Sequence, residues 1–210
     1  MRDVWQSERW ESWLRSLAKF YDYSMGNTLL IAMQISATAH VASFRVGHIF
    51  DVSQTESEPL PTLVDEVPQG VDRYAAVLGA IRSVSAYPVE FVADLSEGAN
   101  GFFRRGKLIA IREGMPEGQT VKTALHELAH SRLHDGDPEG MPDRAMREVQ
   151  AESVAYAASA ALGLDTSGYS FSYVASWASG KSDEEMRQCL QVVRDATKAM
   201  VEDLQTAMEA

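Results

Sequence analysis

The sequence predicts an α+β fold that is mainly helical and carries one small antiparallel sheet. Most of the 210 residues fall in segments whose apolar side chains recur every three or four positions, the spacing of an amphipathic helix. Strand-like runs are few and short, at 47–52, 88–95 and 107–112, and the last two flank a glycine-rich hairpin at 98–106. A hydrophobic fraction of 45% is ample for a sizeable core.

The helical periodicity defines the elements in order. The predicted helices are 5–21, 24–37, 71–84, 121–134, 143–162, 169–179 and a last helix from residue 182 onward. This last helix begins with a capping box, in which Ser182 and Glu185 satisfy each other's backbone amides. We expect its apolar stripe from Met186 to Met208 to pack on its own domain, and the alternative is that it pairs with a second copy in a homodimer.

A proline-rich and acidic stretch at 53–70 is the best candidate for a boundary between regions. We therefore divide the chain into a helical N-terminal region at 1–55, a connector at 56–70, and a main domain at 71–210 that includes the C-terminal helix.

The charge of the chain argues against strong nucleic-acid binding. The formal net charge is −11, from 19 basic and 30 acidic residues, and no segment stands out as a basic arm. Trp10 and Trp13 have helical spacing in the first predicted helix. We expect them to be packing surface rather than a platform for stacking bases.

The sequence also predicts a compartment. The single cysteine, Cys189, excludes an internal disulfide and a cysteine-based zinc site. The N-terminus lacks the apolar segment of a secretory signal, and no apolar run reaches the ~18–20 residues of a membrane span. We expect a cytoplasmic protein with no membrane association.

The residues that carry chemistry are concentrated at 123–134, TALHELAHSRLH. His126 to His130 form an HExxH motif on a predicted helix, where a spacing of four places both imidazoles on one face. Both can reach one zinc ion at ~2.0–2.1 Å, and Glu127 beside them can act on a zinc-activated water as general base. Ordinary surface or buried histidines are the alternative, but the motif with a compatible third ligand favours zinc.

A zinc site needs a third protein ligand, and the helix at 143–162 offers two carboxylates, Glu148 and Glu152. Glu148 follows His130 at close to the spacing in thermolysin-like enzymes, in which the first acid binds zinc and the second orients a ligand histidine. We assign Glu148 to the metal and Glu152 to the histidine behind it, with the reverse assignment as the alternative. His134 is expected to cap its helix, and it is an alternative ligand.

Two further elements are candidates for a part in the reaction. Tyr169 and Tyr173 could stabilise an oxyanion with a hydroxyl, although aromatic packing is the more ordinary role of such residues. The strand at 107–112 precedes the metal helix, and as an exposed edge strand it would pair with an extended peptide. This arrangement favours peptide hydrolysis over small-molecule chemistry.

Two segments together resemble a known family. TVKTALHELAHSRLH and the later REVQAESVAYAASAALGLDTSGYSFSYVASW resemble the metallopeptidase domain of ArdC-type antirestriction proteins. These belong with the ImmA/IrrE-like zinc peptidases of plasmids, phages and conjugative elements. The resemblance implies a zincin-like fold, with His126, His130 and Glu148 as zinc ligands and Glu127 as the catalytic acid/base.

The resemblance extends to the N-terminal part and covers most of residues 24–177. GNTLLIAMQISATAHVASF resembles the start of the family's single-stranded-DNA-binding domain, and HIFDVSQTESEPLP resembles its connector. The lysine-rich strands that would complete the DNA-binding sheet are missing between these two segments. We therefore expect a truncated DNA-binding-like region at 1–55 that supports the peptidase.

The leading hypothesis is a zinc-dependent metallopeptidase, with one zinc per chain, from a mobile genetic element or prophage. It would hydrolyse a peptide bond in a protein partner. The alternative is a single-stranded-DNA-binding antirestriction protein whose zinc site is structural or vestigial. A third hypothesis is a peptidase fold that regulates a protein partner without cleaving it.

Overall fold

The computed structural model describes residues 7–35 and 73–210, except residues 94, 96, 97, 137, 170, 172, 173 and 179. These residues form a mainly helical α+β structure, as the sequence predicts. The elements in order are α1 (Ser7–Lys19), α2 (Met25–Ile35), α3 (Arg73–Val84), β1 (Val89–Val92), β2 (Gly101–Arg104), β3 (Leu108–Arg112), α4 (Glu117–Leu133), a 3-10 turn (Pro138–Gly140), α5 (Arg144–Ala161), α6 (Val174–Ala178) and α7 (Asp183–Glu209). The strand predicted at 47–52 and the connector predicted at 56–70 lie outside the described residues.

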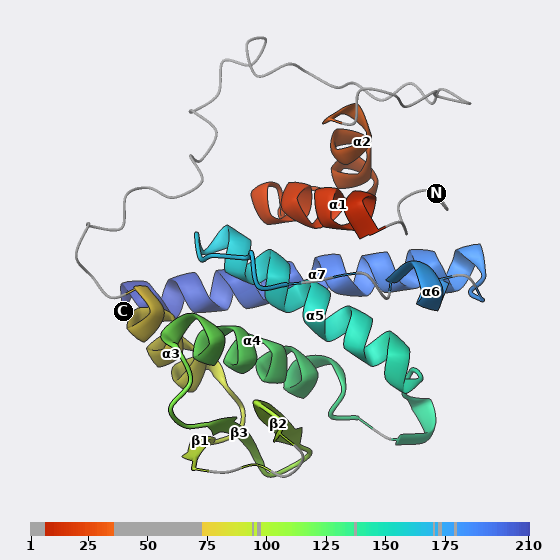
Figure 1. Ribbon diagram of the computed structural model, residues 1–210. Coiled ribbons are helices and arrows are strands. Elements are labelled where there is room, and N and C mark those ends of the chain that lie inside the picture. The colour runs from red at the N-terminus through yellow and green to blue at the C-terminus, as the bar shows by residue number, and fades with distance from the viewer. Residues whose placement is uncertain are drawn as a thin grey trace.

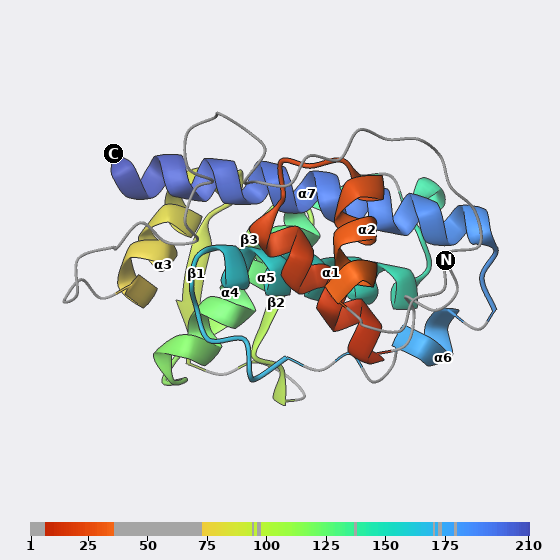
Figure 2. The ribbon, with the colours of Figure 1, turned by 90° about the horizontal axis from the view of Figure 1, so that it is seen from above.

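The helices and the sheet form successive layers. Figure 1 shows α1 and α2 above α5 and α7, with α3 and α4 beneath them and the sheet at the bottom. In Figure 2, seen from above, α1 and α2 lie over the middle of the molecule and α7 runs along its length. Because α4 contacts α5 on one side and both β2 and β3 on the other, it lies between the helical layer and the sheet.

The N-terminal helix α1 is joined to the rest of the molecule by its tryptophans. Trp10 and Trp13 are both fully buried in the hydrophobic core that also contains residues of α4, α5 and α7. The indole N–H of Trp10 donates to the Ser153 hydroxyl of α5 at 3.1 Å, and that of Trp13 donates to the Thr28 hydroxyl of α2 at 3.4 Å. The predicted packing role of the two tryptophans is confirmed, since buried indoles cannot stack on bases.

The C-terminal helix α7 packs within its own chain, against α3 and α5. Its capping box is confirmed, because the Glu185 N–H donates to the Ser182 hydroxyl at 3.2 Å and the Ser182 N–H donates to the Glu185 carboxylate at 2.8 Å. Its buried apolar side chains are those of Met186, Cys189, Leu190, Val193, Met200, Val201 and Leu204. Most of the stripe on which the homodimer alternative depends is therefore covered within the chain, and Met208 at its end is partly buried.

The sheet differs from the expected antiparallel arrangement. Its strand order is β1-β3-β2, with β3 antiparallel to β2 but parallel to β1, so the sheet is mixed. The glycine-rich segment does form a hairpin with β3, but it contributes a strand of its own, β2, which was not among the predicted strands. Because β3 pairs with both β1 and β2, it lies in the centre rather than at an edge. The physical reason lies in the run from Leu108 to Ile111, whose residues Ile109, Ala110 and Ile111 are all buried. A continuous apolar run is typical of a strand that is covered on both faces, whereas a strand with one face in solvent alternates.

Among the helices that the structure describes, none is both long and apolar enough to cross a bilayer.

Candidate metal centre

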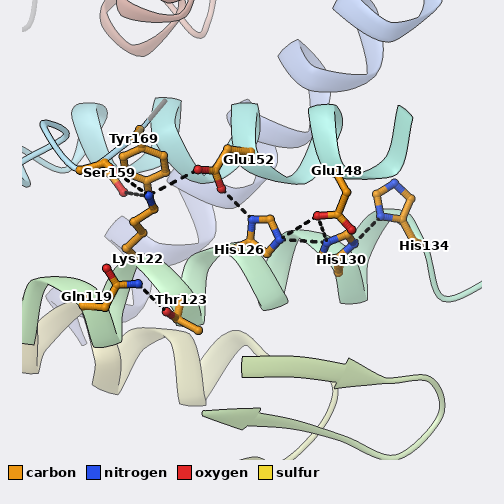
Figure 3. Close-up of polar contacts among 11 residues, drawn as sticks. Gln119, Lys122, Thr123, His126, His130, His134, Glu148, Glu152, Ser159 and Tyr169 are labelled. Carbon is orange, nitrogen blue, oxygen red and sulfur yellow. Dashed lines mark hydrogen bonds and ion pairs between the residues drawn. The ribbon is translucent and has the colours of Figure 1, made fainter. Parts of the chain in front are cut away.

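Helix α4 carries the HExxH motif and is held in one rotational position by its apolar side. Leu125 and Leu128 are fully buried in the core. His126 and His130, one turn apart, consequently project toward α5, and their Nε2 atoms lie 3.0 Å from each other (Figure 3). The predicted placement of the two imidazoles on one helix face is confirmed.

Glu148 comes from the second turn of α5, and the start of that helix is firmly capped. The Asp143 carboxylate accepts a hydrogen bond from the Met146 N–H at 2.7 Å and pairs with Lys181 at 2.7 Å. This capping fixes where α5 begins and so sets which side chains of its next turn point at α4. Glu148 Oε2 lies 3.5 Å from His126 Nε2 and 3.7 Å from His130 Nε2.

The three atoms form a group that could hold a metal ion, since all lie within 4.8 Å of one another. A tetrahedral zinc ion holds its ligand atoms ~3.3–3.4 Å apart, given bonds of ~2.0–2.1 Å. The observed separations of 3.0, 3.5 and 3.7 Å bracket that value. Two imidazoles and one carboxylate, with a fourth position left open, also fit the donor set of catalytic zinc sites.

His126 is supported from behind by a chain of charged groups. Its Nδ1 lies 2.9 Å from Glu152 Oε2, and the other oxygen of Glu152 lies 3.4 Å from the Lys122 ammonium. Lys122 also donates to the Gly168 carbonyl at 2.6 Å and sits 4.0 Å above the centre of the Tyr169 ring. Glu152 therefore contacts the back of His126, which is the position expected for it from the sequence (Figure 3).

His130 is supported from behind by neutral groups instead. Its Nδ1 lies 2.9 Å from Nδ1 of His134, whose Nε2 lies 2.9 Å from the Gln150 side-chain oxygen. His134 is the C-cap residue of α4, as predicted, and its side chain is 3% exposed. It is not a member of the three-residue group that could hold a metal.

Glu127 sits beside the two histidines and is almost fully buried, with 7% of its surface exposed. Burial raises the pKa of its carboxyl above the ordinary value, and the nearby Glu148 adds to this, while His126 and a hydrogen bond from the Phe103 backbone act in the opposite direction. The approach of β2 to Glu127 depends on Gly101, because a Cβ there would lie 2.6 Å from the Thr123 methyl and 3.2 Å from Glu127 Cγ. A glycine is required at this position of β2.

The charges of the metal-free group are strongly coupled. Burial acts to lower the pKa of His126, but hydrogen bonds to Glu148 and Glu152 overcome it and raise the pKa to about 10. Hydrogen bonds from His126 and His130 hold the pKa of Glu148 well below its usual range. By contrast, burial lowers the pKa of His134 to about 4. Without a metal, the cluster thus favours the protonated form of His126 and the neutral form of His134.

The group opens onto a cleft of about 650 Å³ between α4, α5 and the edge strand β2. Residues Gly101, Phe102 and Phe103 of β2 form one wall. The ionic side chains that line the cleft are four cations and three carboxylates: Arg105, Lys122, Arg144, Arg147, Glu127, Glu148 and Glu152. An open cleft lined by an edge strand can admit an extended chain.

The remaining predicted site residues lie elsewhere. Tyr169 is half-buried, its hydroxyl is 2.9 Å from the Ser159 hydroxyl, and it is not among the residues that line the cleft. Its ring packs edge-on against Tyr156 at a centroid distance of 5.4 Å, a contact of the kind expected for aromatic packing. Tyr173 lies outside the described residues.

Sequence reasoning did not single out Lys122, Gln150 or the residues of β2. Lys122 precedes His126 by one helical turn, and Gln150 lies midway between the two glutamates of α5. Helical spacing from the motif could have indicated Lys122. Gln150 had no such signal, because its partner His134 is brought to it only by the packing of α4 on α5.

Comparison with known proteins gives one weak similarity. The chain is 29% identical over 86 residues to "Uncharacterized protein pXO2-81" of Bacillus anthracis, and the match covers 40% of this chain. It spans only 15% of the length of that relative. No family model matches the chain, and no solved structure matches it. The resemblance to ArdC-type and ImmA/IrrE-like proteins therefore stays a prediction from the motif residues.

Proposed function

We propose that this chain is a zinc-dependent metallopeptidase with a zincin-like site, which hydrolyses a peptide bond in a protein partner. The observation that carries the proposal is the meeting of His126, His130 and Glu148 at separations suited to one tetrahedral ion, with Glu127 beside them in an open cleft. The group binds one metal per chain. The resemblance of the motif region to peptidases of mobile genetic elements supports an origin of that kind.

Zinc in this site would supply Lewis-acid chemistry, polarising a carbonyl group and activating water at neutral pH. The residues of the chain supply the proton transfers. Burial raises the pKa of Glu127, which suits its carboxylate to take a proton from the attacking water and then return it to the leaving amine. Glu152 holds the ring of His126 by accepting from its Nδ1–H, which keeps Nε2 free for the metal.

The substrate class follows from the wall of the cleft. The edge strand that lines the cleft is β2, not the strand at 107–112, so an extended substrate would pair its backbone with β2. Gly101 and Phe103 of this strand lie next to Glu127, which would bring a paired peptide bond close to the general base. A protein or peptide substrate fits this geometry.

The single-stranded-DNA-binding alternative receives no support from the described part of the N-terminal region, where Trp10 and Trp13 are buried. It would be revived by salt-dependent binding of this chain to a single-stranded oligonucleotide.

Elemental analysis tests the proposal directly. Protein purified without chelator is compared with Glu148→Ala and with the matched control Glu202→Ala, which removes a carboxylate of α7 that is 49% exposed. We expect close to one zinc per chain in the wild type and the control, and little in Glu148→Ala. Folded wild-type protein without zinc would contradict the proposal, and full zinc in Glu148→Ala would move the third ligand to Glu152 or His134.

A further inference from the structure

We propose that His134 and Gln150 form a neutral hydrogen-bonded support that positions His130 for metal binding. The support runs from Nδ1 of His130 to Nδ1 of His134, and from Nε2 of His134 to Oε1 of Gln150. This inference rests on the proposed zinc site and adds two positioning residues to it. The sequence motif HExxHxxxH presents three histidines at intervals of four, which invites the interpretation that all three bind metal. In the structure the third histidine, His134, contacts the ligand histidine His130 and is not a member of the metal-binding group.

The direction of each hydrogen bond follows from the place of Nε2 of His130. That atom faces His126 and Glu148, so it is the nitrogen that would bind the metal, and the ring proton must then sit on Nδ1. Nδ1 of His130 lies 2.9 Å from Nδ1 of His134, and one proton serves this contact. His134 must therefore accept through Nδ1 and carry its own proton on Nε2.

The next contact agrees with that assignment. Nε2 of His134 lies 2.9 Å from Gln150 Oε1, which is an acceptor and requires a donor opposite it. Both side chains are nearly inaccessible to water, with His134 3% and Gln150 5% exposed. Without each other they would leave polar atoms buried and unpaired, which is costly. The chain of bonds is consistent from the ligand histidine to α5.

The arrangement gives each ligand histidine its own support. Glu152 fixes the ring of His126, and His134 with Gln150 fixes the ring of His130. Groups that hold a ligand histidine in this way set its ring orientation and raise its basicity, and their loss costs about 10–100-fold in metal affinity. We expect that loss from changes at His134, although it never touches the metal.

Zinc dissociation constants, measured by chelator competition on the full chain, test the inference. His134→Leu removes the acceptor but fills the space, and we expect about 10–100-fold weaker zinc binding. In His134→Asn the amide oxygen replaces Nδ1 as acceptor, so zinc affinity should stay within about threefold of the wild type. If His134 only packs, the order reverses, because the apolar leucine fills the site better than the smaller asparagine.

A second pair of variants examines Gln150 in the same assay. Gln150→Glu keeps an acceptor for His134 and should retain zinc affinity, whereas Gln150→Leu should weaken it. Ser131→Ala is the matched control, since Ser131 is a buried polar residue of α4 whose hydroxyl donates to the Leu128 carbonyl at 2.8 Å. Equal affinity in wild type, His134→Leu and Gln150→Leu would overturn the inference while leaving the zinc site intact. A wild type without zinc affinity would overturn the proposed function instead.

Nitrogen NMR of the zinc-loaded protein gives a readout that does not depend on folding of any variant. We expect the imidazole of His134 to be the tautomer protonated at Nε2, and that of His130 to be protonated at Nδ1. A His134 protonated at Nδ1 would contradict the direction of both hydrogen bonds.

Discussion

The two sides of helix α5 contact different helices and have different roles. Toward α4 it presents Glu148 and Glu152, which meet the histidines of the HExxH motif. Toward α1 it presents Ser153 and Tyr156, which bond Trp10 and Arg15 at 3.1 Å each. We call these the metal side and the core side of α5. Figure 1 shows the two neighbours, α1 above α5 and α4 below it.

The difference lies in how each side handles polar groups. The metal side gathers several ionisable groups around one point, and each of them perturbs the others. The core side has mostly apolar contacts, with hydrogen bonds that satisfy the Trp10 indole and the Tyr156 hydroxyl. Burial of apolar area is the main source of folding free energy, and clustered charges are the main source of chemistry. Substitutions on the two sides should therefore have separable effects.

The largest expected effect lies next to the metal side. Glu127→Gln keeps the size of the side chain but removes its ability to take a proton. Hydrolysis of the protein that the wild type cleaves should fall about 10²–10⁴-fold, while zinc content and unfolding free energy stay close to wild type. Activity is followed by electrophoresis and zinc by elemental analysis. Loss of zinc together with activity would show that Glu127 serves the metal rather than the proton transfer.

The core side should show the opposite pattern. Trp10→Ala empties a fully buried indole site, and we expect the unfolding free energy to fall by about 3–5 kcal/mol. Zinc affinity of the folded protein should not change, because Trp10 belongs to α1, which lies on the other side of α5 from α4 (Figure 1). Denaturant unfolding and chelator competition measure the two quantities. Trp10→Phe, which refills much of the space, should lose less stability, and an equal loss would argue against cavity formation.

The sequence could predict those features of both regions that depend on local spacing along one helix. The periodicity of Trp10, Trp13 and the α7 stripe indicated buried helices, because an amphipathic helix buries whatever is apolar. The motif spacing indicated the ligand geometry, because positions four apart on one helix are neighbours in any fold. Local rules were sufficient for both features.

Features that depend on pairing between elements were harder to predict. The sheet was expected to be antiparallel with an edge at 107–112, yet β3 is central and parallel to β1. A strand's place in a sheet depends on contacts with distant residues, and only the unbroken apolar run Leu108–Ile111 hinted at it. Gln150 was missed for a similar reason, since its contact with His134 exists only once α4 and α5 have packed.

A change in the group that supports His126 should have a smaller effect on the metal side, seen in the zinc affinity. Glu152→Gln keeps an oxygen near His126 Nδ1 but removes the charge that also pairs with Lys122. We expect about 10–100-fold weaker zinc binding by chelator competition, with the protein still folded. Glu202→Gln is the matched control, because it changes a glutamate of α7 that is 49% exposed and pairs with Lys198 rather than with a residue of α4 or α5. Unchanged zinc affinity in Glu152→Gln would mean that packing alone orients His126.

The smallest expected effect is a change in unfolding free energy from a substitution on the core side of α5. Ser153→Ala removes the hydroxyl that accepts from the Trp10 indole at 3.1 Å, and Ser153 itself is fully buried. A hydrogen bond of this kind contributes about 1 kcal/mol, so denaturant unfolding should show a loss of that size. Zinc affinity should be unchanged, although Ser153 is the next residue after Glu152. Weakened zinc binding in Ser153→Ala would break the division of α5, because it would show that the position of Glu152 depends on the contact with α1.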